Sequence, residues 1–258
     1  SKQFFYKASY GAFSLATAYS SRTKGIPTAA FGQAFNDPRS ETTDEQAFVD
    51  LKYRDRLSDT LQINANAFIG HYLYDGIYVY SGTPPVLNND ESHGDWWGGE
   101  LRFLSTALAR HKLVFGAEYR NNTHQDQSNY DASPGYFSYL DDKRNGSMSG
   151  IYAQDEYALS DQWTINAGAR YDHIVQGTHD NVINPRLAVI YKPQAATSYK
   201  LLYGTAFRTP NVLERYYGTV AGGYKQNPDL APEKIKTVEA VLERYVSNDV
   251  RVTGSVFW

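Results

Sequence analysis

The side chains best suited to catalysis or metal binding are scattered along this sequence. Its six histidines, at positions 71, 93, 111, 124, 173 and 179, form no His-x-x-x-His pair and no ligand spacing with carboxylates. The chain contains no cysteine, no G-x-S-x-G elbow and no phosphate-binding or dinucleotide-binding loop. We therefore predict no enzyme, no catalytic residue, no cofactor and no bound metal, with the histidines lying in surface loops.

Aromatic side chains in two polar stretches are better candidates for binding a ligand. Tyr136 and Tyr139 lie in one stretch, and Tyr216 and Tyr217 lie in another. Tyrosine is rigid and has a polar tip, which suits recognition surfaces, although it also serves in loop packing. Arg208 is a candidate anchor for an anionic substrate, and its alternative role is an ion pair.

The composition excludes several classes of protein. The 258 residues carry a net charge of −3, which leaves no excess of lysine and arginine for nucleic-acid phosphates. The mean hydropathy is −0.54, and no long apolar run predicts a transmembrane helix. Aromatic residues make up 15% of the chain. Both ends read as strand sequence, so we expect a segment of a longer protein.

Apolar and polar residues alternate along most of the chain, which is the pattern of half-buried strands. The clearest case is 61–69, where Leu, Ile, Ala, Ala and Ile alternate with Gln, Asn, Asn and Phe. We predict about 12 strands, most of them longer than is usual in soluble proteins. They are expected near 2–9, 12–22, 46–56, 59–75, 95–108, 111–123, 148–159, 162–175, 184–193, 197–208, 233–246 and 249–258.

Short and long connections alternate between these strands. The long ones are expected at 23–45, 76–94, 124–147, 176–183 and 209–232. In an up-and-down meander every second connection lies on the same side, so all the long loops share one end. Long outward loops opposite tight periplasmic turns are typical of transmembrane β-barrels.

The two faces of the strands fit the same architecture. The polar face carries charges at regular positions, which suits a water-filled or plugged bore better than a dry core. Aromatics such as Tyr72, Trp96 and Trp97 stand near strand ends, where a membrane girdle would place them. We therefore predict an all-β, antiparallel, up-and-down transmembrane barrel. The alternative is a soluble β-sandwich with one wet face.

Several motifs resemble those of one family. Residues 200–211 read KLLYGTAFRTPN and are followed by Glu214; they resemble the YG-x-AFR-x-P-N…E signature of TonB-dependent outer-membrane receptors. Residues 227–234 (NPDLAPEK) resemble the NP-x-L-x-PE segment of the same receptors. Residues 152–156 (YAQDE), 168–172 (GARYD) and 96–100 (WWGGE) are similar to further strands of these barrels.

The resemblance implies a fold and a function. Such receptors have barrels of about 22 strands with an N-terminal plug. No plug motif is present here, so residues 1–258 are expected to form a partial receptor barrel domain in the outer membrane of a Gram-negative bacterium. The implied partners are the lipid bilayer, the TonB complex acting through the absent plug, and a ferric siderophore or cobalamin-like ligand. The alternatives are a passive porin and a small complete structural barrel.

Overall fold

The segments in which apolar and polar residues alternate form one continuous series of strands in the computed structural model. The structure describes residues 1–218 and 224–258, apart from the side chain of Thr178. Within these residues the chain forms thirteen strands and one short helix. In chain order they are β1 (Lys2–Tyr10), β2 (Phe13–Gly25), β3 (Glu41–Ser58), β4 (Leu61–Tyr80), β5 (Val86–Ser105), β6 (His111–Ser133), β7 (Phe137–Asp142), β8 (Gly146–Ala158), β9 (Trp163–Gln176), β10 (Thr178–Gln194), β11 (Thr197–Arg208), α1 (Val212–Tyr216), β12 (Glu233–Tyr245) and β13 (Arg251–Phe257).

The strands pair in the order in which they follow one another. The path runs β1-β2-β3-β4-β5-β6-β8-β9-β10-β11-β12-β13, and every pairing in it is antiparallel. The short strand β7 lies off this path and pairs with β6. The prediction of an up-and-down antiparallel sheet of about 12 strands is confirmed.

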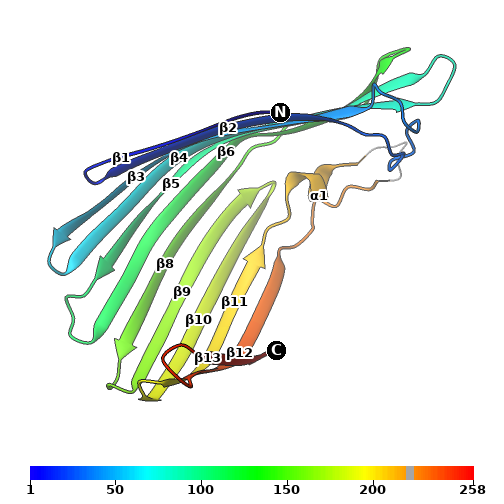
Figure 1. Cartoon of the computed structure of the whole chain (residues 1–258). Helices are drawn as coiled ribbons and strands as arrows, with labels where there is room; N and C mark the ends of the chain where they lie inside the picture. The colour runs from blue at the N-terminus through cyan, green and yellow to red at the C-terminus, as the bar shows by residue number, and fades with distance from the viewer. Residues whose placement is uncertain (219–223) are drawn as a thin grey trace.

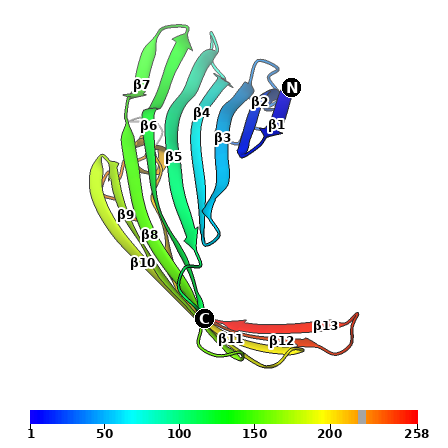
Figure 2. The ribbon, with the colours of Figure 1, turned by 90° about the vertical axis from the view of Figure 1, so that its left-hand side faces the viewer.

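The sheet curls into an open wall rather than lying flat. Figure 1 shows β1–β6 and β8–β13 as two arms of one curved surface, with α1 between them. The view turned by 90° shows the wall bending from β1 round to β13 (Figure 2). The sheet is not closed, since β1 and β13 stand at the two ends of the strand order.

The outer face of this wall is apolar and uncovered. Ile69, Leu101 and Leu201 expose 58%, 42% and 55% of their surface, although each lies within a strand and not in a loop. A soluble sandwich would bury such side chains against a second sheet, and the described residues form a single sheet. The prediction of a lipid-facing barrel wall is confirmed, and the sandwich alternative is wrong.

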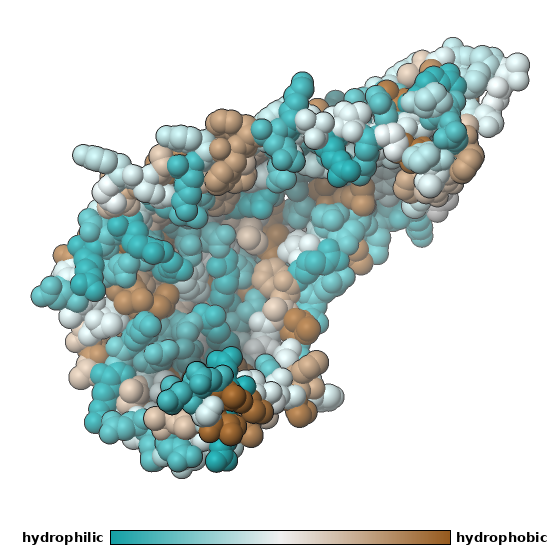
Figure 3. All heavy atoms as spheres, in the orientation of Figure 1, coloured by the Kyte–Doolittle hydropathy of each residue, from teal (hydrophilic) through white to brown (hydrophobic). Residues whose placement is uncertain are grey.

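The inner face is polar, and several of its charges are paired. Arg170 donates hydrogen bonds to Glu118 at 2.9 Å and to Asp172 at 2.8 Å. Lys200 lies 2.9 Å from Glu243. Figure 3 shows mostly hydrophilic residues around the hollow of the wall. Paired charges at strand positions explain how so polar a face is tolerated on the inside of the curve.

Two predicted loops are mostly strand. The expected connection at 76–94 shrinks to 81–85, and most of the one at 124–147 belongs to β6 and β7. Residues 86–94 and 124–133 are mostly polar on both faces, so they lack the apolar alternation that reveals a strand, but their backbones still pair in the ladder. Residues 76–80 (GIYVY) are mostly apolar and continue β4, with Val79 only 1% exposed. The predicted loop at 176–183 is also wrong, because β9 turns directly into β10 at Gly177, whose φ is +73°.

The central strands are longer than a membrane requires. β4, β5 and β6 have 20, 20 and 23 residues, whereas about 9–11 residues span a bilayer. Counting that length from the tight-turn ends leaves residues 72–80, 86–94 and 122–133 outside the bilayer. We call these three ranges the outer extension. The rings of Trp97 and Tyr119, 5.5 Å apart, lie on the outer face just below it.

No helix in the described ranges is long and apolar enough to cross a membrane.

Candidate functional site

The segment 209–232, between β11 and β12, begins with a short capped helix. Pro210 follows the end of β11, because proline cannot donate to the ladder. Asn211 then caps α1: its side chain accepts a hydrogen bond from the Glu214 amide at 2.9 Å. The Glu214 carboxylate accepts one from the Asn211 amide, also at 2.9 Å. This capping box stabilises the first turn of α1.

Arg208 joins the end of β11 to α1 and to the start of β12. Its guanidinium donates two hydrogen bonds to Glu214, at 2.8 and 2.9 Å, and two to Glu233, at 2.7 and 3.0 Å. These bonds hold the pKa of both carboxyls below their usual range. The structure thus places Arg208 in an ion pair on the inner face. Its role as an anchor for an anionic ligand stays a prediction.

Arg215 fastens the same segment to the tip of the β9–β10 hairpin. The residue is 1% exposed. Its guanidinium donates hydrogen bonds to the backbone oxygens of Gln176, at 2.9 Å, and Leu230, at 3.0 Å, and it contacts Asp180 at 3.4 Å. Sequence reasoning missed this arginine, because its burial depends on contacts with distant segments.

Tyr216 packs against two other outer segments. It is 3% exposed, and the guanidinium carbon of Arg144 lies 3.3 Å from the centre of its ring. Its hydroxyl donates to the Gln176 oxygen at 3.4 Å, next to Gly177. A β-carbon on Gly177 would come within 2.0 Å of that hydroxyl, so this glycine admits the tyrosine. Tyr216 therefore has a packing role, and contact with a ligand stays a prediction.

Tyr217 lies against the inner face of the outer extension. Its hydroxyl donates to Asp90 at 2.8 Å and accepts from the Asn129 amide at 3.2 Å. Asn129 and Asn88 exchange hydrogen bonds at 3.1 and 3.2 Å. Burial raises the pKa of Asp90 and that of Tyr217, so the proton stays on the phenol at neutral pH.

The hydrogen bonds continue from Asn88 to the β6–β7 hairpin. Asn88 donates to Asp131 at 3.0 Å, and Tyr139 donates to the other oxygen of Asp131 at 2.7 Å. A chain of side chains therefore connects two of the predicted contact residues, Tyr139 and Tyr217. Tyr136 lies apart from it, 74% exposed at the hairpin tip.

A pocket of about 430 Å³ lies between the start of α1 and the wall. Its lining includes Tyr72, Trp96, Arg120, Gln127, Val212 and Leu213. The guanidinium carbon of Arg120 stands 5.0 Å from the centre of the Trp96 ring, and Gln127 donates to the Val212 oxygen at 3.2 Å. A cation beside an aromatic face is suited to a ligand that is anionic or carries π-electron rings.

Sequence reasoning placed part of this pocket wrongly. Tyr72 and Trp96 were expected in the membrane girdle, but both face inward, while Trp97 faces outward. Neighbouring residues of a strand point to opposite faces, so only one tryptophan of the pair can meet lipid. The inward ring needs space, and Gly70 provides it, because a β-carbon there would lie 2.2 Å from Trp96. Arg120 was recognised only as a charge of the polar face.

The prediction that the histidines lie in surface loops is wrong, because all six lie in strands. His71, His93 and His124 lie in β4, β5 and β6, and all three contact Asp95 on the outer face. Their grouping depends on strand register, which the spacing of histidines along the chain does not reveal. The three residues His71, His93 and Asp95 form a group whose side chains could hold a metal ion.

Fold and site together define a class of protein. A wall that is apolar outside and charged inside, with an outer loop folded into the curve, belongs to an outer-membrane β-barrel whose bore is partly filled. The family model described as "TonB dependent receptor-like, beta-barrel" matches residues 2–258. The chain therefore belongs to the β-barrel family of TonB-dependent receptors, which lie in the outer membrane of Gram-negative bacteria.

Individual relatives agree with this assignment. The chain is 32% identical over 140 residues to the iron-regulated outer membrane virulence protein of Vibrio cholerae, which covers 51% of the chain and 20% of that protein. It is 29% identical over 128 residues to the probable TonB-dependent receptor BfrD of Bordetella pertussis, which covers 42% of the chain and 17% of that protein. The match thus spans about a fifth of the length of these curated relatives.

A solved structure shows the same fold. The siderophore receptor PiuA of Acinetobacter baumannii superposes with a TM-score of 0.70 at 16% identity. The superposition covers 95% of this chain and 47% of the PiuA chain. The present wall therefore corresponds to about half the length of a complete receptor.

Proposed function

We propose that this chain is a part of the barrel of a receptor that takes up a ferric siderophore across the outer membrane. Energy would come from the TonB complex acting on a plug that lies outside these 258 residues. No bond of the ligand would be made or broken, so the protein would act as a transporter and not as an enzyme.

The observation that carries this proposal is the pocket under α1. Ferric siderophores are bulky chelates that often carry negative charge and aromatic groups. Arg120 and Trp96 offer such a ligand a cation and a ring, 5.0 Å apart, at the outer end of the bore. The Vibrio relative is an iron-regulated protein and the Acinetobacter neighbour is a siderophore receptor, which favours the same ligand class.

The inward position of α1 favours a receptor over a passive porin. A porin needs an open aqueous bore, whereas here residues 212–217 lie on the inner face and are hydrogen-bonded to β5, β6 and the β9–β10 hairpin. A segment held by several distant strands can narrow the bore around a ligand. Cobalamin, haem and other metal chelates are the competing ligands of the same proposal.

The test uses the full-length receptor, purified in detergent and also expressed in cells. Binding of ferric catecholates, ferric hydroxamates, ferric citrate and cobalamin would be measured by quenching of tryptophan fluorescence. Uptake of radioactive iron would be compared with and without a functional TonB complex. We expect saturable binding of one ferric chelate class and uptake that requires TonB.

Two arginine variants test the pocket itself. Arg120→Gln removes a charge-assisted hydrogen bond worth about 1.5–3 kcal/mol, so it should weaken binding about 10- to 100-fold. Arg54→Gln is the matched control, since Arg54 lies on the same face near the tight turns and contacts Asn64 at 2.7 Å. Failure of every ferric chelate to bind the intact receptor would reject the siderophore proposal.

A further inference from the structure

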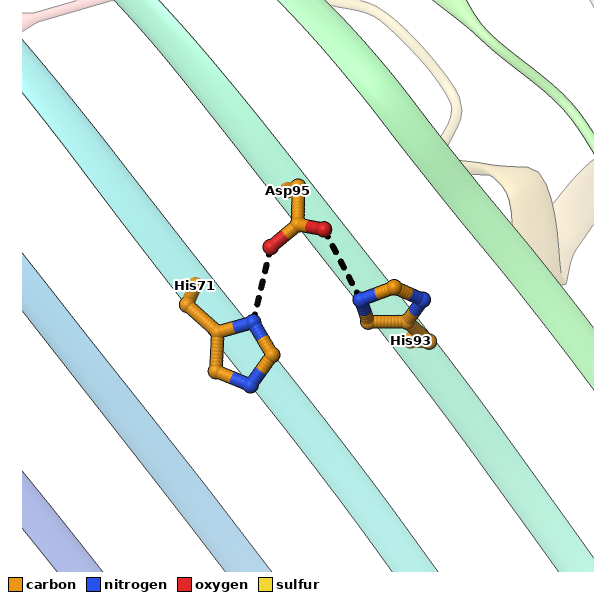
Figure 4. A group of neighbouring side chains, drawn as sticks. All are labelled: His71, His93 and Asp95. Carbon is orange, nitrogen blue, oxygen red and sulfur yellow. Dashed lines mark hydrogen bonds and ion pairs between the residues drawn. The ribbon is translucent and has the colours of Figure 1, made fainter.

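Three histidines from three adjacent strands meet around one carboxylate on the outer face of the wall. His71 on β4 and His124 on β6 both stand opposite Asp95 in the strand register, and His93 precedes Asp95 by two residues on β5. Figure 4 shows His71 and His93 directed at the two oxygens of Asp95. We call His71, His93, Asp95 and His124 the outer histidine cluster.

The contacts of this cluster converge on the carboxylate. Nδ1 of His71 lies 2.7 Å from Oδ1 of Asp95, and Nε2 of His93 lies 2.9 Å from Oδ2. Nδ1 of His124 lies 3.2 Å from the same Oδ2. The ligand atoms of His71, His93 and Asp95 all lie within 4.8 Å of one another. These three ligand groups therefore surround one small volume, and His124 contacts the same carboxylate oxygen as His93.

We propose that the outer histidine cluster binds a divalent first-row transition ion, with zinc as its representative. Three imidazole nitrogens and one carboxylate oxygen make up a four-ligand tetrahedral set. Neighbouring ligand atoms around tetrahedral zinc are roughly 3.3 Å apart. The ligand atoms of His71, His93 and Asp95 lie within 4.8 Å of one another, so small side-chain rotations bring them to that spacing, and His124 turns toward them to complete the set. Each histidine would bind through the nitrogen that faces Asp95 and keep its proton on the other ring nitrogen.

A second carboxylate supports this geometry. Nδ1 of His93, the nitrogen turned away from Asp95, lies 3.8 Å from Oδ2 of Asp126. In metal sites such an outer carboxylate orients the imidazole and raises its basicity. Asp126 therefore holds the position of an orienting residue and not that of a ligand.

The surroundings favour a cation. Asp75 and Glu91 stand opposite each other in the β4–β5 register, beyond His71 and His93. Like charges directly opposite are destabilising, and a nearby cation offsets them. A pocket of about 500 Å³ lies beside His93, and its charged lining is mostly acidic: Asp75, Glu91, Asp126 and Asp141, with Lys143 paired to Asp141 at 3.3 Å.

The same face carries a simpler pair for comparison. His111 on β6 contacts Asp155 on β8 at 2.6 Å near the tight-turn end. One histidine and one aspartate are too few ligands for a structural zinc site. His111 therefore supplies a matched control for the cluster.

An ion bound in the outer histidine cluster would affect the stability of the barrel. The cluster lies just beyond Trp97 and Tyr119, at the boundary between the membrane-spanning part of the wall and the outer extension. An ion bound there joins β4, β5 and β6 through their side chains. Since it binds the folded barrel, it should stabilise that barrel by mass action.

The experiment uses the full-length receptor without a histidine tag, in detergent micelles and metal-free buffer. Zn²⁺ binding would be measured by titration calorimetry, and Co²⁺ would report tetrahedral ligands through its visible absorption. The variants are His71→Gln combined with His93→Gln, Asp126→Asn alone, and His111→Gln as the control. Strand content by circular dichroism confirms that each variant is folded.

We expect one Zn²⁺ per wild-type receptor, a tetrahedral Co²⁺ spectrum and a higher unfolding temperature with Zn²⁺. The double variant should lose all three, Asp126→Asn should weaken binding about 10-fold, and His111→Gln should change none of them. Absence of a stoichiometric site in the wild type, or equal binding by the folded double variant, would overturn the proposal. If the double variant does not fold, unchanged affinity in Asp126→Asn together with octahedral Co²⁺ in the wild type would do so.

Discussion

The membrane-spanning part of the wall and its outer extension are built from the same strands by different rules. Near the tight turns, alternate residues meet lipid outside and polar groups inside, as Leu201 and Lys200 do on β11. In the outer extension both faces meet water. There, order depends on contacts between distant segments, such as the bond between Tyr217 and Asp90. The same strand therefore needs apolar outward side chains within the bilayer but not beyond it.

The largest effect should come from a charge on the lipid face. Leu201 points outward and its neighbour Leu202 points inward, where its register partner is Glu239. Leu201→Arg should lower the free energy of unfolding in lipid vesicles by about 2–4 kcal/mol. Leu202→Arg is the matched control and should cost much less, because the new cation faces a carboxylate in the bore. Equal losses in both variants would contradict the assignment of the faces.

At the outer end of the wall, loss of Arg215 should have the next largest effect. Arg215→Leu leaves the oxygens of Gln176 and Leu230 without this donor, which should weaken the packing of α1 by about 1–3 kcal/mol. We expect faster hydrogen exchange in α1 and at the β9–β10 tip, and little change near the tight turns. Arg39→Leu, in the exposed 26–40 connection, should leave α1 unchanged. Uniform change throughout the barrel would remove the distinction between the two regions.

Removing one hydroxyl should have a smaller effect. Tyr217→Phe takes the donor from Asp90 and an acceptor from Asn129. The loss should weaken the packing of α1 and Tyr217 against the wall, which we call docking, by about 1–2 kcal/mol. The change would be measured as hydrogen exchange in α1. Tyr224→Phe is the control, because that residue is 59% exposed. The same loss in both variants would show that the bond to Asp90 does not hold the segment.

The smallest effect should be a dependence on pH. Burial raises the pKa of Asp90, so the docked form binds a proton more readily than the undocked form does. Docking should therefore strengthen as the pH falls through that raised pKa toward the usual pKa of aspartate, and weaken as the pH rises through it. Hydrogen exchange in α1, corrected for intrinsic rates, would measure this between pH 7 and 5.

Asp90→Asn should abolish that dependence. Glu214 and Glu233 do not interfere in this range, because their pKa values lie below the usual value for glutamate. The stability that these two carboxylates contribute is fully present above the usual pKa of glutamate, and it is lost as the pH falls through their lowered pKa values. Docking that weakens between pH 7 and 5 would contradict the role given to Asp90.

Much of the barrel wall follows from local sequence. Alternation at 61–69 or 197–208 predicts both the strand and its lipid face, because lipid excludes polar side chains. The same signal fails at 86–94 and 124–133, where water on both faces permits any polar residue. The helix α1 was missed because its five residues are too few for a periodic pattern, and the Asn211-x-x-Glu214 spacing of its capping box was interpreted only as part of the family motif.

By itself, the amino-acid order determined the all-β class, the direction of the meander, the polarity of each face and the family resemblance. These depend on neighbours within one or two strands, and the chain carries that information locally. Tertiary structure alone decided that Arg215 is buried, that Trp96 turns into the bore and that three histidines surround Asp95. Each of these depends on the strand register or on where α1 packs against the wall. A shift of the register by one residue would exchange the two faces of a strand.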